Sequence, residues 1–373
     1  MSSKTEHPSK KGEIEIIAPA RTCLFGDHQD YLGLPVIACA IDRHIRLTAT
    51  PIEEELLRIF LPDIGESTEI PLNANFKNGV QGNHLLSAFK VIKDEGANPE
   101  QGYEITINGN VAINAGISSS SAVMVAWIAF LRTVYLPQLP FNKEHIAQLA
   151  YKAEVIEQNS PGGKMDQYSI SLGQIMYLET DDKNHHELFN RDMPGLIVSE
   201  SGIPKSTLGV LGDLRGKAWQ AINEVTHHLP GFQIAKTIGE DPQKYLPFVS
   251  PELKNVFTAA MENYRITKAA LREMKTPEPN LSRIGELMNE HHEVLRDLLK
   301  ITVPKIDHMI NAAQAHGALG AKIVGSGMGG SIVVLAREED RDQIIDALKN
   351  SGARDAYPVK VDPGVRITQN TLS

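Results

Sequence analysis

The chain lacks several features that define other kinds of protein. Of its 373 residues only two are cysteines and only 6% are aromatic. Two cysteines, Cys23 and Cys39, are too few for a disulfide framework or a cysteine-rich metal site, and they favour a reducing compartment. No apolar run reaches the ~20 residues that a bilayer crossing needs, because the longest, from Ala122 to Leu136, is short and contains Arg132.

An excess of basic charge is also missing. The 37 lysines and arginines are outnumbered by 46 aspartates and glutamates, which leaves a net charge of −9. Because nucleic-acid affinity comes largely from lysine and arginine, we expect no nucleic-acid partner. The first dozen residues are polar and basic without an apolar segment, so we expect no targeting signal, no membrane partner and a cytoplasmic location.

A hydrophobic fraction of 42% excludes a disordered chain, and 373 residues allow two or three domains. The spacing of apolar residues predicts an α+β protein in two halves that join near 180–210. Asn142 is a predicted helix cap, and Gly317 is a predicted helix stop. We expect strands at 13–20, 34–40, 43–50, 57–61, 103–108, 174–179, 195–200, 322–324 and 332–335. We expect helices at 83–94, after Ser121, at 142–159, 281–300 and 304–316.

The segment 110–122 reads NVAINAGISSSSA and runs directly into an apolar helix. Its small residues let successive backbone N–H groups converge, and the helix N-terminus adds partial positive charge. These features favour an anion site suited to phosphates, although a serine-rich helix cap is an alternative interpretation. Because no G-x-x-x-x-G-K-[ST] occurs in the chain, a nucleotide bound here needs a phosphate cradle of another kind.

Residues 325–330, GSGMGG, match the G-x-G-x-x-G dinucleotide fingerprint in form only. That fingerprint needs a helix directly after its glycines, with the helix N-terminus on the pyrophosphate. The following residues, 331–335, read SIVVL and predict a strand instead. We therefore expect a tight strand–turn–strand hairpin, whose glycines let a ligand or another backbone come close.

Two loops carry dense hydrogen-bonding groups. The segment 21–33, RTCLFGDHQDYLG, suits a polyhydroxylated ligand or an exposed, solvated turn. The segment 160–167, SPGGKMDQ, holds Asp166 as its only acid, and a lone aspartate in a loop is more often a cap than a base. Neither loop decides the function by itself.

Three pairs of adjacent histidines, at 185–186, 227–228 and 291–292, raise the question of a metal site. None forms H-E-x-x-H, and none has cysteine partners at ligand spacing. Adjacent residues on a helix point to different sides, so they do not chelate one ion together. We expect these histidines at the surface.

Taken in order, these segments resemble the three signature motifs of the GHMP kinase superfamily, and within it those of galactokinases. Residues 18–42, APARTCLFGDHQDYLGLPVIACAID, resemble the galactokinase motif with its Gly-Glu-His-Thr-Asp-Tyr core. Residues 114–122 are similar to the Gly-Leu-Ser-Ser-Ser-Ala phosphate loop, and residues 320–335 are similar to the glycine-rich third motif. Residues 153–167 resemble the stretch that carries the family's metal-binding glutamate and catalytic aspartate. The resemblance spans most of the chain.

The resemblance implies a two-lobed GHMP kinase fold of the α+β class, with lobes at 1–195 and 196–373 and the active site in the cleft between them. It implies transfer of the γ-phosphoryl group of ATP to a monosaccharide hydroxyl, as in a galactokinase-like sugar 1-kinase, with Mg²⁺ as cofactor. The implied partners are ATP and a small-molecule acceptor, and the implied assembly is a monomer or homodimer.

The resemblance also implies roles for particular residues. Asp166 accepts or orients the acceptor's proton, and Arg21 keeps it ionised, because a guanidinium lowers the pKa of a neighbouring carboxyl group. Mg²⁺ is assigned to Ser120 and Glu154. The acceptor is assigned to Asp27, His28, Asp30, Gly163 and Asp166. The phosphates of ATP are assigned to Asn114, Ala115, Gly116, Ile117, Ser118, Ser119, Ser120 and Ser121.

The departures from the galactokinase pattern concern the acceptor. Asp27 and Gln29 stand where galactokinases have glutamate and threonine. Lys164 stands where they usually have an apolar residue. A cation at this position suits an acidic sugar such as a uronic acid, or it points to solvent, and we favour solvent.

The letters LFG and PVIA in the first motif are more similar to mevalonate kinases, which lack the Asp30–Tyr31 pair. A mevalonate kinase-like enzyme or a uronic-acid kinase is therefore the alternative. A sugar- and ATP-binding sensor without turnover is a third hypothesis. It is disfavoured because the chain retains Arg21, Ser120, Glu154 and Asp166.

Overall fold

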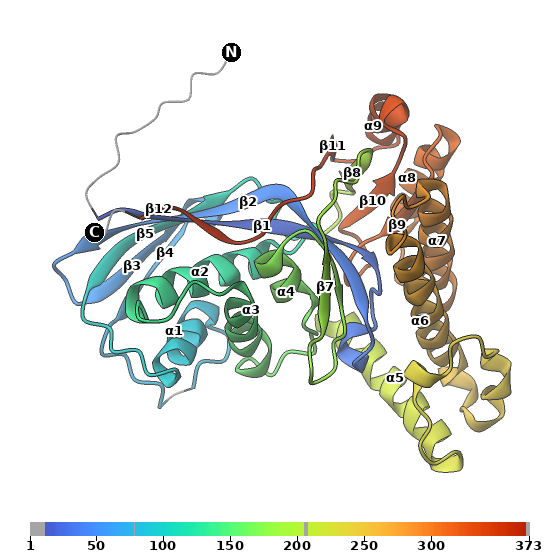
Figure 1. Ribbon diagram of the computed structural model, residues 1–373, viewed down its shortest axis with the longest axis horizontal. Helices are drawn as coiled ribbons and strands as arrows, with labels where there is room; N and C mark the ends of the chain where they lie inside the picture. Colours follow the sequence, from blue (N-terminus) through green and yellow to red (C-terminus); the bar gives the residue numbers. More distant parts are fainter. Residues whose placement is uncertain (1–11, 78, 205–207, 371–373) are drawn as a thin grey trace.

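The computed structural model of the chain describes residues 12–77, 79–204 and 208–370. Two sheets, each packed against its own group of helices, lie side by side (Figure 1). Residues 1–11 of the expected polar tail lie outside the described residues. Among the residues described, no helix is long and apolar enough to cross a membrane.

The larger sheet comprises eight strands of the described chain, in the order β12-β1-β2-β5-β3-β4, with β6 paired to β2 and β7 to β6. β3 runs parallel to β5, and the other described pairings are antiparallel. The strands are β1 (Ile14–Phe25), β2 (Val36–Ile52), β3 (Leu56–Leu61), β4 (Glu66–Pro71), β5 (Gly102–Gly109), β6 (Ile175–Leu178), β7 (His186–Phe189) and β12 (Arg366–Asn370).

Four helices cover one face of this sheet (Figure 1). They are α1 (His84–Asp94), α2 (Ser119–Tyr135), α3 (Lys143–Tyr151) and α4 (Met165–Leu172), and α3 continues into a π-helical turn, Lys152–Ile156. The side chains of Asn83 and Asn142 accept hydrogen bonds at the starts of α1 and α3, which confirms the predicted cap at Asn142.

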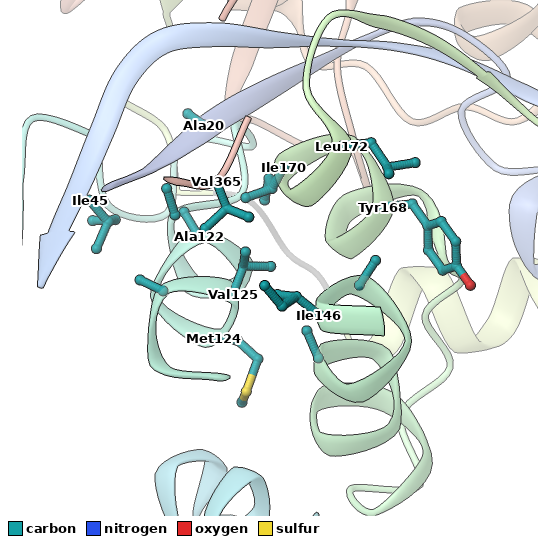
Figure 2. Packing of buried hydrophobic residues seen from close by; sticks show 14 of the residues in the cluster. Ala20, Ile45, Ala122, Met124, Val125, Ile146, Tyr168, Ile170, Leu172 and Val365 are labelled. Carbon is teal, nitrogen blue, oxygen red and sulfur yellow. The ribbon is translucent and has the colours of Figure 1, made fainter. Parts of the chain in front are cut away.

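The apolar helix α2 lies in the middle of this layer, in contact with β1, β2, α1, α3 and α4. A helix that is hydrophobic around its whole circumference must be covered on all sides. Figure 2 shows Ala122, Met124 and Val125 of α2 among side chains from the sheet and from α3 and α4. This packing fixes the N-terminal end of α2, where the serine-rich segment lies.

The second half contains a four-stranded antiparallel sheet, in the order β11-β8-β10-β9, and the long helices of the chain. Its strands are β8 (Leu196–Glu200), β9 (Gly320–Ile323), β10 (Ser331–Leu335) and β11 (Asp355–Pro358). Its helices are α5 (Leu208–His228), α6 (Lys254–Met274), α7 (Leu281–Glu293), α8 (Pro304–Ala315) and α9 (Arg341–Asn350), and α7 continues into a π-helical turn, Val294–Leu298.

The α+β fold class is confirmed, and one of the predicted strand arrangements is wrong. The strands expected at 34–40 and 43–50 are one strand, β2, because a bulge opposite Pro19 and Ala20 absorbs the expected break. The strands expected at 174–179 and 195–200 both form, as β6 and β8. β6 forms a hairpin with β7, whose letters HELF show no clear alternation, and β8 enters the other sheet.

The chain passes from the larger to the smaller sheet between β7 and β8, near the expected lobe boundary at residues 195 and 196. The last strand, β12, returns to pair with β1. The division into lobes at 1–195 and 196–373 remains a proposal. In the structure, β12 belongs to the larger sheet although it lies in the second of these ranges.

Candidate active site

Segments from both halves surround one cavity of about 150 Å³. They are the acceptor loop (residues 26–33) after β1, the phosphate loop (residues 114–121) before and into α2, the residues between the π-helical turn and α4, and the glycine turn (residues 324–330) between β9 and β10. The lining residues are Arg21, Asp27, His28, Asp30, Gly116, Ser120, Ser121, Glu154, Val155, Ser160, Gly162, Gly163, Met165, Asp166, Gln167, Leu211, Gly325 and Ser326.

An ion pair between a buried arginine and a partly buried aspartate lies at this cavity. Arg21, on β1, is only 3% exposed, and its Nε donates to Oδ1 of Asp166 at 2.7 Å. The same guanidinium donates through Nη1 to the carbonyl oxygen of Gly116 at 2.8 Å. Burial alone lowers the pKa of Arg21, but the adjacent Asp166 outweighs this and raises it, so Arg21 stays charged. The second oxygen of Asp166, Oδ2, accepts from the hydroxyl of Ser118 at 2.5 Å.

The phosphate loop has an unusual backbone. Asn114, Gly116 and Ser118 alternate with other residues and all have positive φ, at 56°, 84° and 63°. Such alternation turns backbone N–H groups toward a common side, and the α2 N-terminus follows directly. A Cβ added to Gly116 would lie 3.1 Å from the carbonyl oxygen of Val324, so the glycine lets the two loops touch.

The structure divides the predicted phosphate-binding residues. Gly116, Ser120 and Ser121 line the main cavity, and Ile117 and Ser118 are buried beside it. Asn114 and Ala115 line a second cavity of about 130 Å³, which also contacts Glu200, Arg354 and neighbouring residues. The glycine turn is the hairpin expected from the sequence, since β9 and β10 pair antiparallel around it.

Glu154, on the π-helical turn, faces α2 and α4. Its Oε1 accepts from the hydroxyl of Ser121 at 2.9 Å, and its Oε2 accepts from Nε2 of Gln167 at 2.7 Å. The assignment of Mg²⁺ to Ser120 and Glu154 remains a prediction, and the serine seen to bond to Glu154 is the next residue, Ser121. Consecutive helical residues point about 100° apart, so only one of the two serines can face the glutamate. Ser120 is exposed and lines the cavity.

Carboxylate and hydroxyl oxygens are the ligand types that Mg²⁺ takes, usually with one or two carboxylates and with substrate phosphates completing its octahedron. Glu154 and the serine hydroxyls at the start of α2 supply such oxygens in this cavity. No group of three or more histidine, cysteine, aspartate or glutamate side chains in the described part of the chain forms a closed metal site. The residues present thus fit an open Mg²⁺ site and not a structural metal centre.

Asp30 lies against Gly163 on the acceptor side of the cavity. Its Oδ1 accepts the N–H of Tyr31 at 2.9 Å. A Cβ added to Gly163 would come within 2.0 Å of Oδ2 of Asp30, so a larger residue at position 163 would displace the Asp30 carboxylate. Burial, and next the charge of Asp166, raise the pKa of Asp30 to about 6.

His28 is held by both of its ring nitrogens. Nε2 lies 3.2 Å from the carbonyl oxygen of Ser326, which can only accept, so Nε2 carries the proton. Nδ1, at 3.2 Å from the hydroxyl of Tyr31, is therefore the acceptor. Burial lowers the pKa of His28, in keeping with this neutral form. His28 thus presents a fixed, uncharged ring to the cavity.

Asp27 differs from Asp30, because both of its oxygens have buried partners. Oδ2 lies 2.6 Å from Nζ of Lys322, and Oδ1 accepts the N–H of Gly325 at 2.7 Å. Asp27 borders the cavity but is only 1% exposed.

The other two departures from the galactokinase pattern point away from the cavity. Gln29 is fully buried, and its Nε2 donates to the carbonyl of Pro35 and to Oγ1 of Thr267. Nζ of Lys164 donates to the carbonyl of Asp181 at 2.8 Å and to Oδ1 of Asn184 at 2.7 Å. Gln29 thus belongs to the core, and Lys164 binds the turn between β6 and β7.

The expectation of surface histidines is wrong for one of the three pairs. His291 and His292 are 0% and 3% exposed, whereas 185–186 and 227–228 lie at or near the surface. The ring of His291 stacks on Phe25, with centroids 6.1 Å apart, and burial lowers the pKa of His291 to about 3. The pair lies on α7 where that helix packs on β9 and β1, a contact that helical spacing alone does not reveal.

Sequence reasoning missed several residues of the site. Lys322, Gln167 and Leu211 received no role, although each lines the cavity or bonds to a residue that does. For Lys322 a signal existed: it is a charged residue in a short, otherwise apolar strand. A buried charge of this kind requires a partner.

This cavity combines a partly buried Arg–Asp pair, a phosphate-type loop at a helix N-terminus and oxygen ligands suited to Mg²⁺. Phosphoryl transfer needs little more than positioning and charge stabilisation by such groups. The fold and the site together define a small-molecule phosphotransferase.

Comparison with known proteins agrees with this class. Residues 83–174 match the family model of the GHMP kinases N terminal domain, residues 267–354 match GHMP kinases C terminal, and residues 6–51 match the galactokinase galactose-binding signature. A galactokinase from Haemophilus influenzae is 28% identical, with 95% of each chain covered. A mevalonate kinase from Pyrococcus furiosus is 27% identical, covering 90% of this chain and 92% of its own.

Solved structures resemble the fold. The galactokinase of Lactococcus lactis, crystallised with galactose, superposes with a TM-score of 0.84 at 20% identity over 95% of each chain. The mevalonate kinase of Methanococcus jannaschii superposes with a TM-score of 0.70 at 21% identity, covering 95% of this chain and 100% of its own. The chain belongs to the GHMP kinase superfamily and is galactokinase-like within it. It is a phosphotransferase with an alcohol group as acceptor, and ATP is its phosphoryl donor.

Proposed function

We propose that the protein transfers the γ-phosphoryl group of ATP to the anomeric hydroxyl of galactose or of a closely related monosaccharide, with Mg²⁺ as cofactor. The observation that carries this proposal is the Arg21–Asp166 pair, set between the phosphate loop and the acceptor loop. The galactose-binding signature at 6–51 and the similarity to galactokinases support a sugar as the acceptor.

Asp166 is the proposed base. It receives the proton of the acceptor hydroxyl as that oxygen bonds to the γ-phosphorus, while the bond from the γ-phosphorus to the bridging oxygen breaks and ADP leaves. Its oxygens accept hydrogen bonds from Arg21 and Ser118, which hold the carboxylate in place at the cavity. Arg21 keeps Asp166 ionised and offsets the charge of the transferring group.

The N-terminal end of α2 is the proposed phosphate site. Backbone N–H groups of residues 116–119 would surround the phosphates, supported by the helix N-terminus. Glu154 and Ser121, with Ser120 beside them, would hold Mg²⁺. A bound Mg²⁺ would neutralise charge on the β- and γ-phosphate oxygens.

Asp30 is the proposed ligand of the acceptor's hydroxyl groups, with His28 and Gly163 shaping the same end of the cavity. Asp30 keeps acceptor capacity after its bond to the N–H of Tyr31, whereas both nitrogens of His28 are engaged. We also propose that the enzyme is cytoplasmic and acts as a monomer or homodimer. Light scattering on the purified protein measures its oligomeric state.

A coupled ADP-release assay with Mg·ATP tests the function. The panel would contain galactose, other neutral hexoses, pentoses, amino sugars, uronic acids and mevalonate, with Asp166→Asn as the blank. We expect turnover on galactose or a close relative and none with the blank. Turnover confined to mevalonate or to uronic acids would refute the proposed acceptor, and no turnover on any of them would refute the sugar kinase.

A further inference from the structure

Asp27 and Lys322 form an ion pair inside the protein, although they are 295 positions apart in the chain. Both side chains are 0% exposed, and Nζ lies 2.6 Å from Oδ2. The other oxygen, Oδ1, accepts the N–H of Gly325 at 2.7 Å, and Lys322 also donates to the carbonyl of Cys23 at 2.9 Å. The pair thus joins β1 and the acceptor loop to β9 and the glycine turn.

The ion pair leaves Asp27 little capacity to bind a substrate. Its two oxygens have charged or backbone partners at short distance, and its side chain is 0% exposed although Asp27 borders the cavity. Burial alone would raise the pKa of Asp27, but Lys322, His291 and the N–H of Gly325 together outweigh it and lower the pKa to about 2. The neighbouring His291 is uncharged near neutral pH, so Lys322 is the cation in direct contact with Asp27.

The glycine turn that Asp27 holds touches both substrate sites. On the acceptor side, the carbonyl of Ser326 binds His28. On the phosphate side, a Cβ at Gly325 would lie 3.3 Å from the carbonyl oxygen of Gly116, the same oxygen that accepts from Arg21. A shift of this turn would therefore move the phosphate loop and the acceptor loop relative to each other.

We propose that Asp27 is a positioning residue and not a ligand of the acceptor: together with Lys322 it fixes the glycine turn between the phosphate loop and the acceptor loop. This departs from the role that the galactokinase resemblance implies, in which the residue at this position binds the sugar. The proposal rests on the proposed function for the identity of the two substrates.

The test compares Asp27→Asn, Lys322→Met and the double variant, with Asp30→Asn as the matched control on the acceptor side. Calorimetry measures the Kd of the non-hydrolysable ATP analogue AMPPNP with Mg²⁺, which requires no acceptor. The ADP-release assay measures kcat and the KM for galactose. Circular dichroism melting confirms that each variant is folded.

We expect each single variant at Asp27 or Lys322 to weaken AMPPNP binding about tenfold and to lower kcat, because it leaves one buried charge without a partner. The double variant removes both charges and should recover AMPPNP binding to within about threefold of the unaltered protein. Its galactose KM should also recover. Asp30→Asn should raise the galactose KM and leave AMPPNP binding unchanged.

Unchanged AMPPNP binding in the single variants, with a galactose KM raised equally in Asp27→Asn and in the double variant, would overturn the proposal. If the single variants do not fold, the galactose KM of the double variant decides the role of Asp27. A raised KM would mean that Asp27 binds the acceptor, and an unchanged KM would mean that it only positions the glycine turn. If galactose is not turned over by the unaltered protein, the proposed acceptor fails while AMPPNP binding still decides the role of Asp27. Absence of AMPPNP binding to the unaltered protein would refute both proposals.

Discussion

Nε of Arg21 lies 2.7 Å from Oδ1 of Asp166, although the two residues are 145 positions apart in the chain. Arg21 comes from the middle of β1, and Asp166 from the first turn of α4. β1 and α4 pack against each other, so both residues of the pair are held by packed elements of secondary structure. The proposed base is therefore pre-positioned before either substrate binds, as electrostatic catalysis requires.

Asp166→Asn is expected to abolish turnover and leave ATP binding nearly intact. The amide has almost the same shape, but it cannot take the proton of the acceptor hydroxyl. We expect kcat to fall by about 10²–10⁴-fold, the usual contribution of a general base. The ADP-release assay measures kcat, and AMPPNP calorimetry measures nucleotide binding. Near-normal turnover in this variant would exclude Asp166 as the base.

Asp30→Asn is expected to raise the acceptor KM more than the ATP KM. The carboxylate is assigned to acceptor hydroxyls, and one such hydrogen bond to a charged group contributes about 1.5–3 kcal/mol, which corresponds to roughly 10–150-fold in affinity. Initial rates at varied acceptor and varied ATP separate the two constants. Equal increases in both would mean that Asp30 supports the cleft as a whole.

The stability of the protein is expected to depend on the ionisation of Asp30. Burial and Asp166 raise its folded-state pKa to about 6, above the ordinary 3.8 of aspartate. The folded protein therefore holds this proton more tightly than the unfolded chain, and the stabilisation is full below about pH 4 and lost as the pH rises through 6.

Asp30→Asn cannot ionise, so at pH 7.5 it should be more stable than the unaltered protein by about 3 kcal/mol, since one unit of pKa corresponds to about 1.36 kcal/mol. Near pH 4 the difference should vanish. Urea denaturation at the two pH values measures it. A difference that is the same at both would show that Asp30 has an ordinary pKa.

Ser121→Ala is expected to weaken the affinity for Mg²⁺ more than Ser120→Ala does. Of these two serines, Ser121 is the one whose hydroxyl is seen to donate to Glu154, at 2.9 Å. Losing a group that orients a metal-binding carboxylate typically costs about 10–100-fold in metal affinity. The Mg²⁺ concentration at half-maximal rate measures the effect, and each serine variant serves as the control for the other. A larger effect of Ser120→Ala would return the role to Ser120.

Lys164→Ala is expected to leave acceptor choice unchanged. Nζ of Lys164 is held by Asp181 and Asn184, and the side chain is absent from the lining of the cavity. Substitutions away from a site usually change energies by less than about 0.5 kcal/mol, or about twofold in rate. The ratio of kcat/KM for galactose and galacturonate measures the effect. Selective loss of galacturonate turnover would restore the uronic-acid alternative.

Much of the local structure followed from the sequence. The cap at Asn142, the apolar helix after the serine-rich segment and the hairpin around the glycines of residues 325–330 all occur as expected. Each depends on residues that are near neighbours in the chain, through side-chain capping, hydrophobic spacing or the conformational freedom of glycine. The three motifs were enough to indicate the superfamily and its phosphotransferase chemistry.

The contacts within the site were decided by the tertiary structure. Whether Ser120 or Ser121 meets Glu154 depends on the rotation of α2 against its neighbours, and one residue changes that by about 100°. Whether Asp27 faces a sugar or Lys322 depends on where β9 and the glycine turn pack, 295 residues later. The burial of His291 depends on the contact of α7 with β1 and β9. The sequence by itself determined which chemical groups are present and the local shapes that carry them, whereas only long-range packing determined which of those groups meet, because it is set by the summed contacts of the whole core.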